Sequence, residues 1–396
     1  MFGIRDEYRR SQVAIAALFC CLGFQYATWV SRIPALKTRL DLSEAELGLL
    51  LMVCGAGAAV SFPLVASLTK RLGSRRLSVL SALALAVVLM ALSVTPNYPV
   101  TLLIVFFDGV AVGCLNVAMN AQAAALEVRY QRTTMARMHA TFSAGSLFAA
   151  LLASGVTSFS PALPAHFGTA TALVAVVVLA ARPGLLTEDQ KAADPSDPSD
   201  SSESSGKQGR LGLTLPTRVT IWMGLAMAFG TVTEGAMNDW SALYLKDSAG
   251  AAAELAPLGI AVVSVMMVLA RLFADGWRTK WGDERIVRVG SALAGAGLAV
   301  ALLAGGVVPA LLGFACVGLG IAAVTPCVYV AAARQGSDAL ALVAAMGTTG
   351  LLAGPAVIGF IANGTSLVWG MGAVAVSALV VSACSTRIRF PSLADA

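Results

Sequence analysis

Charged residues are scarce in this chain of 396 residues, at 12% of the sequence, whereas apolar residues make up 57%. Soluble domains typically contain about 25% charged residues. A water-soluble fold of this sequence would have to bury nearly every residue and would keep almost no polar surface. The composition therefore excludes a soluble protein and indicates one that is embedded in a membrane.

Several chemical signatures are also missing. There is no phosphate-binding sequence of the form G-x-x-x-x-G-K-[ST], so nucleotide hydrolysis by that route is excluded. No Ser/His/Asp group, carboxylate pair or metal-ligand spacing recurs between the apolar runs, so we expect no enzyme, no metal and no other cofactor. The seven cysteines lie inside apolar runs rather than in loops where disulfides form. They are Cys20, Cys21, Cys54, Cys114, Cys316, Cys327 and Cys384.

Twelve long apolar runs dominate what is present. A run of about 20 apolar residues can cross a bilayer as an α-helix. We therefore expect an all-α polytopic membrane protein with twelve transmembrane helices. The expected spans are residues 13–30, 44–68, 77–95, 100–127, 137–158, 166–181, 217–245, 254–275, 286–307, 308–334, 338–363 and 365–384.

The basic residues are distributed unevenly between the two ends of these spans. Of 27 Lys and Arg residues, 23 fall at the N-terminus, in every second loop or at the C-terminus, and 4 fall in the intervening loops. Cytoplasmic loops of membrane proteins are enriched in Lys and Arg. The distribution predicts a multi-pass protein of the cell inner (plasma) membrane with both termini in the cytoplasm. It also accounts for the net charge of +5 without a nucleic-acid partner.

A polar stretch divides the chain into two halves of six spans each. Residues 194–206 contain only Asp, Pro, Ser, Glu and Gly, a composition typical of a flexible linker. We expect an N-terminal six-helix bundle over residues 1–182 and a C-terminal six-helix bundle over residues 217–396. Residues 183–216 are expected to form a disordered cytoplasmic linker between them.

Short matches between the halves indicate an internal repeat. Ser81-Ala82-Leu83 recurs as Ser291-Ala292-Leu293, 210 residues later, and Gly145 recurs as Gly350, 205 residues later. Because six spans return the chain to the same side, such repeats are parallel and related by a pseudo-two-fold axis along the membrane normal. Coincidence among helices rich in Ala and Gly is the alternative.

The segment between the second and third runs carries a recognisable motif. Residues 66–76 read Ala-Ser-Leu-Thr-Lys-Arg-Leu-Gly-Ser-Arg-Arg and are similar to G-x-L-x-D-R-x-G-R-R, the signature of the major facilitator superfamily (MFS). Ala66 and Lys70 replace the initial Gly and the Asp. In the family that Asp is thought to hold a gating contact, and Asp275, in a weaker echo of the motif in the second half, is the candidate to replace it. Four positions match: Leu68, Arg71, Gly73 and Arg75.

Other phrases resemble a sugar-permease-like bacterial branch of the superfamily that is distantly related to fucose permeases. In span eleven, residues 350–359 resemble the G-x-x-x-G-P-x-x-G motif that antiporter-type drug exporters carry in span five. Because it lies in the other half, this motif is discounted as an argument for export. The permease-like phrases are Trp29-Val-Ser-Arg32-Ile-Pro34-Ala-Leu-Lys37, Met138-His139-Ala-Thr-Phe-Ser143-Ala-Gly145 and Glu234-Gly-Ala-Met-Asn238-Asp239-Trp240.

The resemblance implies the 6 + 6 MFS fold and secondary active transport of a small organic molecule. The energy would come from an ion gradient, most simply of protons, while two bundles rock about a cavity at the membrane midplane. The permease-like phrases favour uptake of a sugar-like solute. An Ala-rich cavity with few deep polar side chains favours export of a drug-like or metabolite substrate, and the balance tips slightly towards export.

A non-transporting membrane receptor or a membrane enzyme is the alternative from another functional class. The loops are mostly too short to build an enzyme site, and only residues 183–216 are long enough to signal. We expect a monomer whose partners are a small-molecule substrate, protons and the lipid bilayer, with no nucleic acid.

Glu234 is the first candidate for a transport role, because a charged group inside a bilayer costs about 2.5–3.5 kcal/mol even on lenient scales. It lies twelve residues before Lys246 and thus about 18 Å from the outer end of its span. Asn238 lies on the same helical face, and Asp239 follows it. Burial favours the neutral form of a carboxyl group, so Glu234 could exchange a proton or contact substrate. Permanent pairing with a basic residue is the alternative.

Four further polar residues are candidates inside the spans. Asp108, about 12 Å below the outer surface, could couple protons, bind a cationic substrate or merely face an outer vestibule. Asn116 and Asn120 are one helical turn apart and could line a cavity or hydrogen-bond across helices. His139 titrates near neutral pH and could relay protons or be structural.

Gln25, Trp29 and Arg32 share a face of span one. An amide beside an aromatic ring suits a substrate that is partly polar and partly apolar. Trp is also enriched at membrane interfaces for reasons unrelated to substrate, which is the alternative for Trp29. Arg32 is a candidate partner for one of the three acids above, across an outer gate.

Two prolines are expected to bend spans of the second half. Pro326 removes a backbone hydrogen bond in span ten, and Pro355 does the same in span eleven. Broken helices line binding sites and flex in transporters. Tyr329 is the aromatic side chain nearest the first break and a candidate to line the cavity.

The exceptions to the charge distribution cluster at the outer ends of spans one and seven. They lie next to the acids Asp41 and Asp239 in the sequence. These exceptions are candidates for an outer gate: Arg32, Lys37, Arg39 and Lys246.

Overall fold

The computed structural model describes residues 7–130, 132, 134–187, 217–388 and 390. Every regular element in this part of the chain is a helix. This agrees with the membrane environment that the composition indicates, because a helix pairs its backbone N–H and C=O groups internally and needs no water to do so.

The N-terminal half contains six spans. One long helix, α3, covers two of them, because its backbone breaks at Gly73, whose φ of 75° lies in the left-handed region that favours glycine. The elements are α1 (Glu7–Val30), α2 (Ile33–Leu40), α3 (Glu44–Val94), α4 (Tyr98–Tyr130), α5 (Met135–Phe159), α6 (Leu163–Ala181) and the 3-10 turn η1 (Arg182–Gly184).

The C-terminal half also contains six spans. The predicted bend in span ten is confirmed, because α10 ends at Ile321 and α11 begins at Val324, two residues before Pro326. Pro355, in contrast, lies inside α12 and does not divide it into two helices, so the expected bend there stays a prediction. The helices are α7 (Arg218–Asp247), α8 (Leu258–Trp281), α9 (Asp283–Ala304), α10 (Val307–Ile321), α11 (Val324–Ala333), α12 (Ser337–Gly364) and α13 (Leu367–Ser385).

Ten segments of the described chain are long and apolar enough to cross a membrane. The two spans that miss this criterion are α7 and α8, of which α8 has only a shorter apolar stretch, Leu258–Ala274. Both helices carry charged or amide side chains in their middle, as shown below. The twelve spans of the sequence pattern are therefore all present as helices, and the two least apolar ones are neighbours in the chain.

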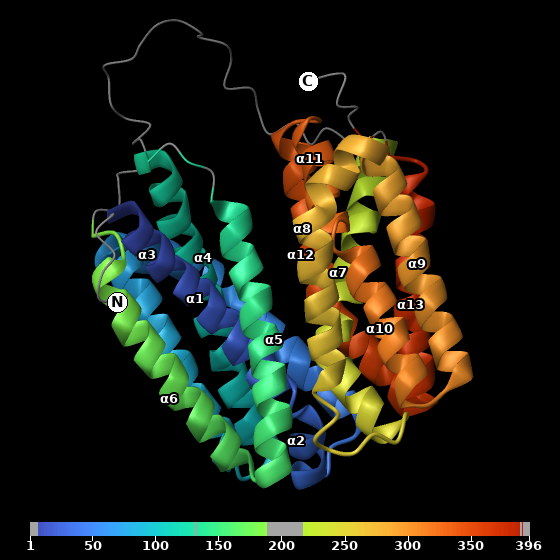
Figure 1. The fold of residues 1–396 in the computed structure, drawn as a ribbon, viewed down its shortest axis with the longest axis horizontal. Helices are drawn as coiled ribbons and strands as arrows, with labels where there is room; N and C mark the ends of the chain where they lie inside the picture. Colours follow the sequence, from blue (N-terminus) through green and yellow to red (C-terminus); the bar gives the residue numbers. More distant parts are fainter. Residues whose placement is uncertain (1–6, 131, 133, 188–216, 389, 391–396) are drawn as a thin grey trace, which may run out of the picture.

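The helices form two groups, α1–α6 and α7–α13, that meet at one end and diverge towards the other (Figure 1). We call the end where α1 begins and α13 ends the basic end, and the opposite end, which carries α2, the sealed end. The groups meet where α3 packs against α12 and α5 against α8. A Cβ atom on Gly48 would lie 2.8 Å from the Pro355 carbonyl oxygen, and one on Gly359 would lie 2.5 Å from that of Glu44. Only glycine permits this close approach of α3 and α12.

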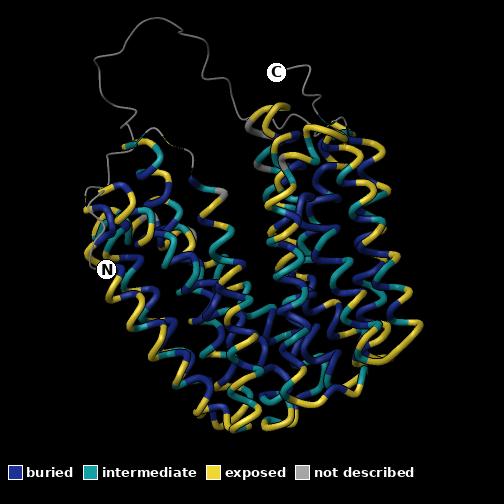
Figure 2. The backbone as a smooth tube through the Cα atoms, viewed as in Figure 1, coloured by how far each residue is buried: buried dark blue, intermediate teal, exposed yellow. Residues whose placement is uncertain are grey.

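The outer surfaces of both groups are apolar. Exposed residues follow the outward faces of the helices, and buried ones lie inside each group and at the contact between them (Figure 2). A surface of large apolar side chains is suited to lipid and not to water. Among the most exposed are Val87, Leu103, Val176, Val300 and Leu303.

The start of the expected linker is part of the fold. Leu185 and Leu186 are buried, and the Gln122 side chain hydrogen-bonds the backbone N–H and carbonyl of Leu186 at 2.9 and 3.1 Å. The expectation of disorder from residue 183 is therefore wrong for residues 183–187, which pack against the N-terminal half. The rest of the expected linker, residues 188–216, lies outside the described residues.

Candidate functional site

A cavity of about 240 Å³ lies between the two helix groups. Its walls come from α4 and α5 on one side and from α7 and α8 on the other. Because hydroxyl, amide and charged groups converge on it, the expectation of an Ala-rich cavity is wrong for this site. The lining residues are Asn116, Met119, His139, Phe142, Ser143, Ser146, Glu234, Asn238, Ser264, Met267 and Arg271.

An ion pair lies in the wall of this cavity that the C-terminal half contributes. The Arg271 guanidinium lies 3.3 Å from the Glu234 carboxylate, and both side chains remain about 30% exposed. The same guanidinium donates a hydrogen bond of 2.9 Å to the Ser143 hydroxyl. Because Ser143 belongs to α5 and Arg271 to α8, this network joins the two helix groups. Of the two roles weighed for Glu234, the geometry thus shows pairing with a basic residue, inside a cavity that a solute could enter.

Sequence reasoning missed Arg271. The charge distribution counts it with the basic residues that follow span eight, but α8 begins at residue 258 and the arginine lies about 20 Å along it. An arginine inside the apolar run 254–275 was the available signal, because such a charge is costly without a partner. Its partner Glu234 is 37 residues away in the sequence, on a different helix.

Asp108 is buried on α4, and its hydrogen-bond partners among the described residues are uncharged. The Gln25 side-chain amide of α1 donates to its carboxylate at 2.8 Å, and the Cys54 sulfur of α3 lies 3.7 Å from it. The carboxylate has no exposed surface, so the expectation that it faces an outer vestibule is wrong. Within the described part of the chain, no Lys or Arg side chain pairs with it.

Asp239 has a similar environment on α7. It is buried, and the Tyr26 hydroxyl of α1 donates a hydrogen bond to its carboxylate, which again crosses between the two helix groups. Gln25, which holds Asp108, and Tyr26, which holds Asp239, are adjacent residues of α1. The two carboxyl groups therefore belong to one buried cluster, which sequence reasoning did not assemble because its members come from four helices.

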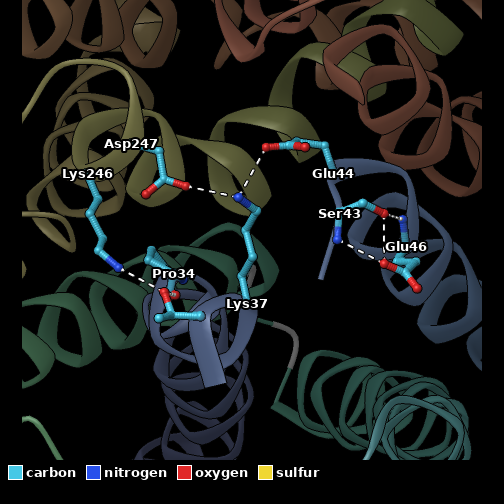
Figure 3. Close-up of polar contacts among 8 residues, drawn as sticks. Pro34, Lys37, Ser43, Glu44, Glu46, Lys246 and Asp247 are labelled. Carbon is cyan, nitrogen blue, oxygen red and sulfur yellow. Dashed lines mark hydrogen bonds and ion pairs between the residues drawn. The ribbon is translucent and has the colours of Figure 1, made fainter. Parts of the chain in front are cut away.

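The sealed end carries a third set of polar contacts (Figure 3). Lys37 of α2 lies 3.1 Å from the Glu44 carboxylate of its own half and 3.3 Å from that of Asp247, at the end of α7. Lys246 donates to the Thr38 hydroxyl at 3.2 Å. Two of the four basic residues expected at an outer gate thus join the halves. Their partners differ from the expected acids, Asp41 and Asp239.

The other two basic residues of this set hold α2 to its own half. Arg32 donates to the Thr157 hydroxyl at 2.5 Å and to the Pro161 carbonyl. Arg39 donates to carbonyls at the end of α3, including that of Leu92 at 3.1 Å, as suits a cation at a helix C-terminus. The expected pairing of Arg32 with Glu234, Asp239 or Asp108 is wrong.

The remaining cavity candidates divide into two groups. Asn116 and His139 line the cavity, and Asn120 donates to the Asn116 side chain at 2.9 Å from one turn away. Gln25, Trp29 and Tyr329 are not among the lining residues, so the expectation that they line the cavity is wrong. Trp29 is buried inside the N-terminal half, and its indole N–H has no hydrogen-bond partner in the described structure.

The gating motif takes a specific form at the basic end. Gly73 forms the break between the two spans of α3, and the Arg75 guanidinium donates to the Arg182 carbonyl at 3.0 Å. Arg71 lies on α3 two residues before the break and is exposed. The Asp275 side chain lies outside the described part of the structure, so its expected gating contact stays a prediction.

Comparison with known proteins gives consistent relatives. The family model described as Major Facilitator Superfamily matches residues 13–338. An uncharacterized MFS-type transporter of Yersinia pestis is 32% identical, with 95% of each chain covered. The membrane protein MosC of Rhizobium meliloti is 29% identical over 89% of this chain and 84% of its own.

Solved structures share the fold at low sequence identity. The nucleoside transporter NupG, as a D323A mutant, superposes with a TM-score of 0.74 at 16% identity, covering 97% of this chain and 100% of its own. A bacterial homolog of the human lysosomal transporter Spinster, in an inward-facing and unoccupied conformation, superposes with a TM-score of 0.72 at 12% identity, covering 98% and 100%.

Proposed function

Because the chain belongs to the major facilitator superfamily of membrane transporters, we propose that it is a secondary transporter that takes up a small polar solute together with protons. The observation that carries this proposal is the polar cavity between the two helix groups, at the position where alternating access requires a solute to bind. Residues of both halves line it, so a solute bound there would contact both.

The lining of the cavity indicates the class of solute. Ser143, Ser146 and Ser264 offer hydroxyls, and Asn116 and Asn238 offer amides, each able to donate and to accept hydrogen bonds. Phe142 adds an aromatic face on which a ring could lie. A hydroxyl-rich or amide-bearing ring compound would satisfy these groups, whereas an apolar drug would leave them unpaired at a cost.

This lining also bears on the direction of transport. The argument for export depended on an apolar cavity, and the sugar-permease-like phrases argue for uptake. With a polar cavity the balance changes to uptake of a sugar-like solute in symport with protons. Efflux by antiport becomes the competing outcome of the transport measurement described below.

We assign proton binding to Asp108 and Asp239 and solute contact to Glu234. A buried carboxylate without a cation has a high cost in its charged form, so a change of surroundings can alter its protonation. Gln25 could serve either state, since its amide N–H can donate to the carboxylate and its carbonyl can accept from the protonated acid. Glu234 has Arg271 beside it and lines the cavity, which places the pair to contact solute.

Alternating access follows from the contacts between the halves. The positive-inside rule supports a cytoplasmic location for the basic end, towards which the two helix groups diverge (Figure 1), so we take the structure as a state that is closed to the outside. Opening to the outside would require separation of Lys37 from Asp247 and Lys246 from Thr38. The hydrogen bond from Tyr26 to Asp239 lies across the same contact, so protonation of Asp239 would act directly on the closure.

Reconstitution in liposomes tests this proposal. Candidate solutes are first selected by their ability to raise the temperature of thermal unfolding, and their accumulation is then measured with and without an imposed inward proton gradient. We expect gradient-driven uptake in the wild type, and solute exchange without net uptake in Asp108→Asn. Glu284→Gln, at an exposed ion pair outside the cavity, is the matched control.

Three results would contradict the assignment. Accumulation driven by an outward proton gradient would indicate export. Saturable binding without transport would indicate a receptor. Asp108→Asn and Asp239→Asn proteins that respond to the gradient like wild type, combined with an unresponsive Glu234→Gln protein, would return the proton to Glu234.

A further inference from the structure

A larger cavity, of about 500 Å³, lies on the side of the C-terminal half at the basic end. It is formed by the last turns of α8, the first turns of α9 and the end of α10. None of its lining residues lines the cavity between the halves. Its volume lies within the range of roughly 300–1,000 Å³ that is typical of small-molecule sites.

Small residues create this hollow, and large apolar ones border it. Ala270 and Ala274 leave the space between α8 and α9 unfilled, and Gly290 lets α9 pack closely against Gly320 of α10 at the border of the hollow. Trp281 and Val289 at its edge are 47% and 56% exposed, so the hollow opens towards the surroundings of the protein. On a surface that faces lipid, such a hollow is accessible to an acyl chain rather than to a water-soluble ligand.

One cation at this hollow pairs with no carboxylate of the residues that the structure describes. Arg278 pairs with Asp283 through two contacts of 2.8 and 2.9 Å, and Arg288 pairs with Glu284 at 3.1 Å. Arg285, between them in the sequence, lines the hollow, is exposed and pairs with no carboxylate of the described residues. The pairing of its neighbours shows that acids are available at this end but do not reach Arg285.

Aromatic side chains indicate how deep in the membrane the site lies. Trp277 stacks on Trp281 with ring centroids 6.2 Å apart, and the Lys280 ammonium lies 5.6 Å from the centre of the Trp281 ring. Trp side chains concentrate where the hydrocarbon of a bilayer meets its headgroups. Arg285 and Lys280 are therefore at the level of the phosphates, with the hollow extending from there along α8 and α9.

We propose that this hollow is a binding site for an anionic phospholipid, whose phosphate pairs with Arg285 and whose acyl chain lies between α8 and α9. Basic pockets between transmembrane helices on the cytoplasmic side recognise anionic headgroups in this way. The site also reaches the break in span ten. Gly320, at the end of α10, and Ala323, directly before α11, both line the hollow. A bound chain would thus support the bend between α10 and α11.

Quenching of Trp fluorescence tests the site. The full chain is reconstituted in phosphatidylcholine vesicles with an increasing fraction of phosphatidylglycerol whose acyl chains carry bromine, and in matched vesicles with brominated phosphatidylcholine. We expect saturable quenching at a low fraction of the anionic lipid, and quenching in proportion to lipid content with the neutral one. The saturable part should disappear in a Trp277→Phe/Trp281→Phe protein, which identifies its location.

Substitutions separate the headgroup contact from the acyl-chain contact. Arg285→Gln should weaken the preference for the anionic lipid about fivefold, the effect of one cation near a membrane surface. Arg285→Lys should retain most of it, and Arg288→Gln, at a paired arginine three residues away, should leave it unchanged. Ala274→Phe, which fills the hollow, should remove the saturable quenching by the anionic lipid and leave only quenching in proportion to lipid content.

Two results would overturn the proposal. Equal quenching by the two brominated lipids in the wild type would show that no anionic headgroup is selected. If the preference for anionic lipid survives in Arg285→Gln, or if Arg288→Gln abolishes it as well, the general charge of the basic end attracts the lipid. Thermal unfolding of each variant in phosphatidylcholine alone confirms that its fold is intact.

Discussion

Two kinds of acidic side chain lie inside the spans of this transporter, and they differ in burial and in the partners that they contact. Asp108 and Asp239 are buried and accept hydrogen bonds from an amide and a hydroxyl, whereas Glu234 lies in the cavity with an arginine. A neutral partner can stabilise a carboxyl group in either protonation state, whereas a cation stabilises only the charged one. The same functional group is thus suited to carry a proton in one place and to hold a fixed charge in the other.

Substitution of Asp108 by Asn should give the largest effect. It removes a titratable group but keeps the shape and a hydrogen bond to Gln25. We expect the proton-driven accumulation ratio to fall about 5- to 150-fold, the loss of a coupling free energy of about 1–3 kcal/mol, with solute exchange retained. Uptake and counterflow in the same liposomes measure the two activities. Loss of both activities would show that Asp108 is required for the fold or for solute binding.

Substitution of Arg271 by Gln should have the next largest effect, because it leaves Glu234 in the cavity without its cation. We expect the free energy of unfolding to fall by about 1–2 kcal/mol. This is less than for a fully buried pair, because both side chains stay partly exposed to solvent. Denaturant unfolding measures this change, and the KM for solute measures any loss of solute affinity. An Arg271→Gln/Glu234→Gln protein should regain stability but not solute affinity, and recovery of both would exclude solute contact by the pair.

Substitution of Tyr26 by Phe should have a moderate effect on coupling. It removes the hydrogen bond to Asp239 that crosses between the halves, and a typical intramolecular hydrogen bond contributes about 0.5–1.5 kcal/mol. We expect slower proton-driven uptake with an unchanged affinity for solute, because Tyr26 does not line the cavity. Initial rates over a range of solute concentrations separate the two. A change in KM alone would place Tyr26 in solute binding instead.

Substitution of Lys37 by Gln should have the smallest effect and extends the comparison to a pair at the protein surface. Its contacts with Glu44 and Asp247 are partly exposed, so we expect them to stabilise the closed sealed end by at most about 1 kcal/mol. Opening of the sealed end should become up to about fivefold faster, and high salt should have the same effect on the wild type. Transport rates at low and high salt measure this, with Arg288→Gln as the control. If salt changes the transport rate of Lys37→Gln as much as that of the wild type, the Lys37 contacts do not hold the sealed end closed.

The sequence predicted the spans well because their signals are local. Apolar length and the distribution of Lys and Arg depend on neighbouring residues only, and the bend beside Pro326 follows from one missing backbone N–H. Pro355 shows the limit of this reasoning, because the surrounding helix continues through it.

The pairing of side chains was much less predictable. Gln25 and Asp108 are 83 residues apart, and Tyr26 and Asp239 are 213 residues apart, so their contacts arise from helix packing alone. Arg271 was hidden for a different reason: a count of basic residues per loop assigns each charge to the nearest helix end. The candidate acids were therefore found one by one, but their partners and their division into two kinds were not.

The crossing of α3 and α12 has a mechanical consequence. At Gly48 and Gly359 the two backbones touch with no side chains between them, so no rotamers interlock there. Helices that contact each other through such surfaces can change their crossing angle without first separating. We expect the crossing to act as the pivot of the transport cycle, with the lengths of α3 and α12 on either side as lever arms. The spacing at one pair of glycines would then set how far each end of the protein opens.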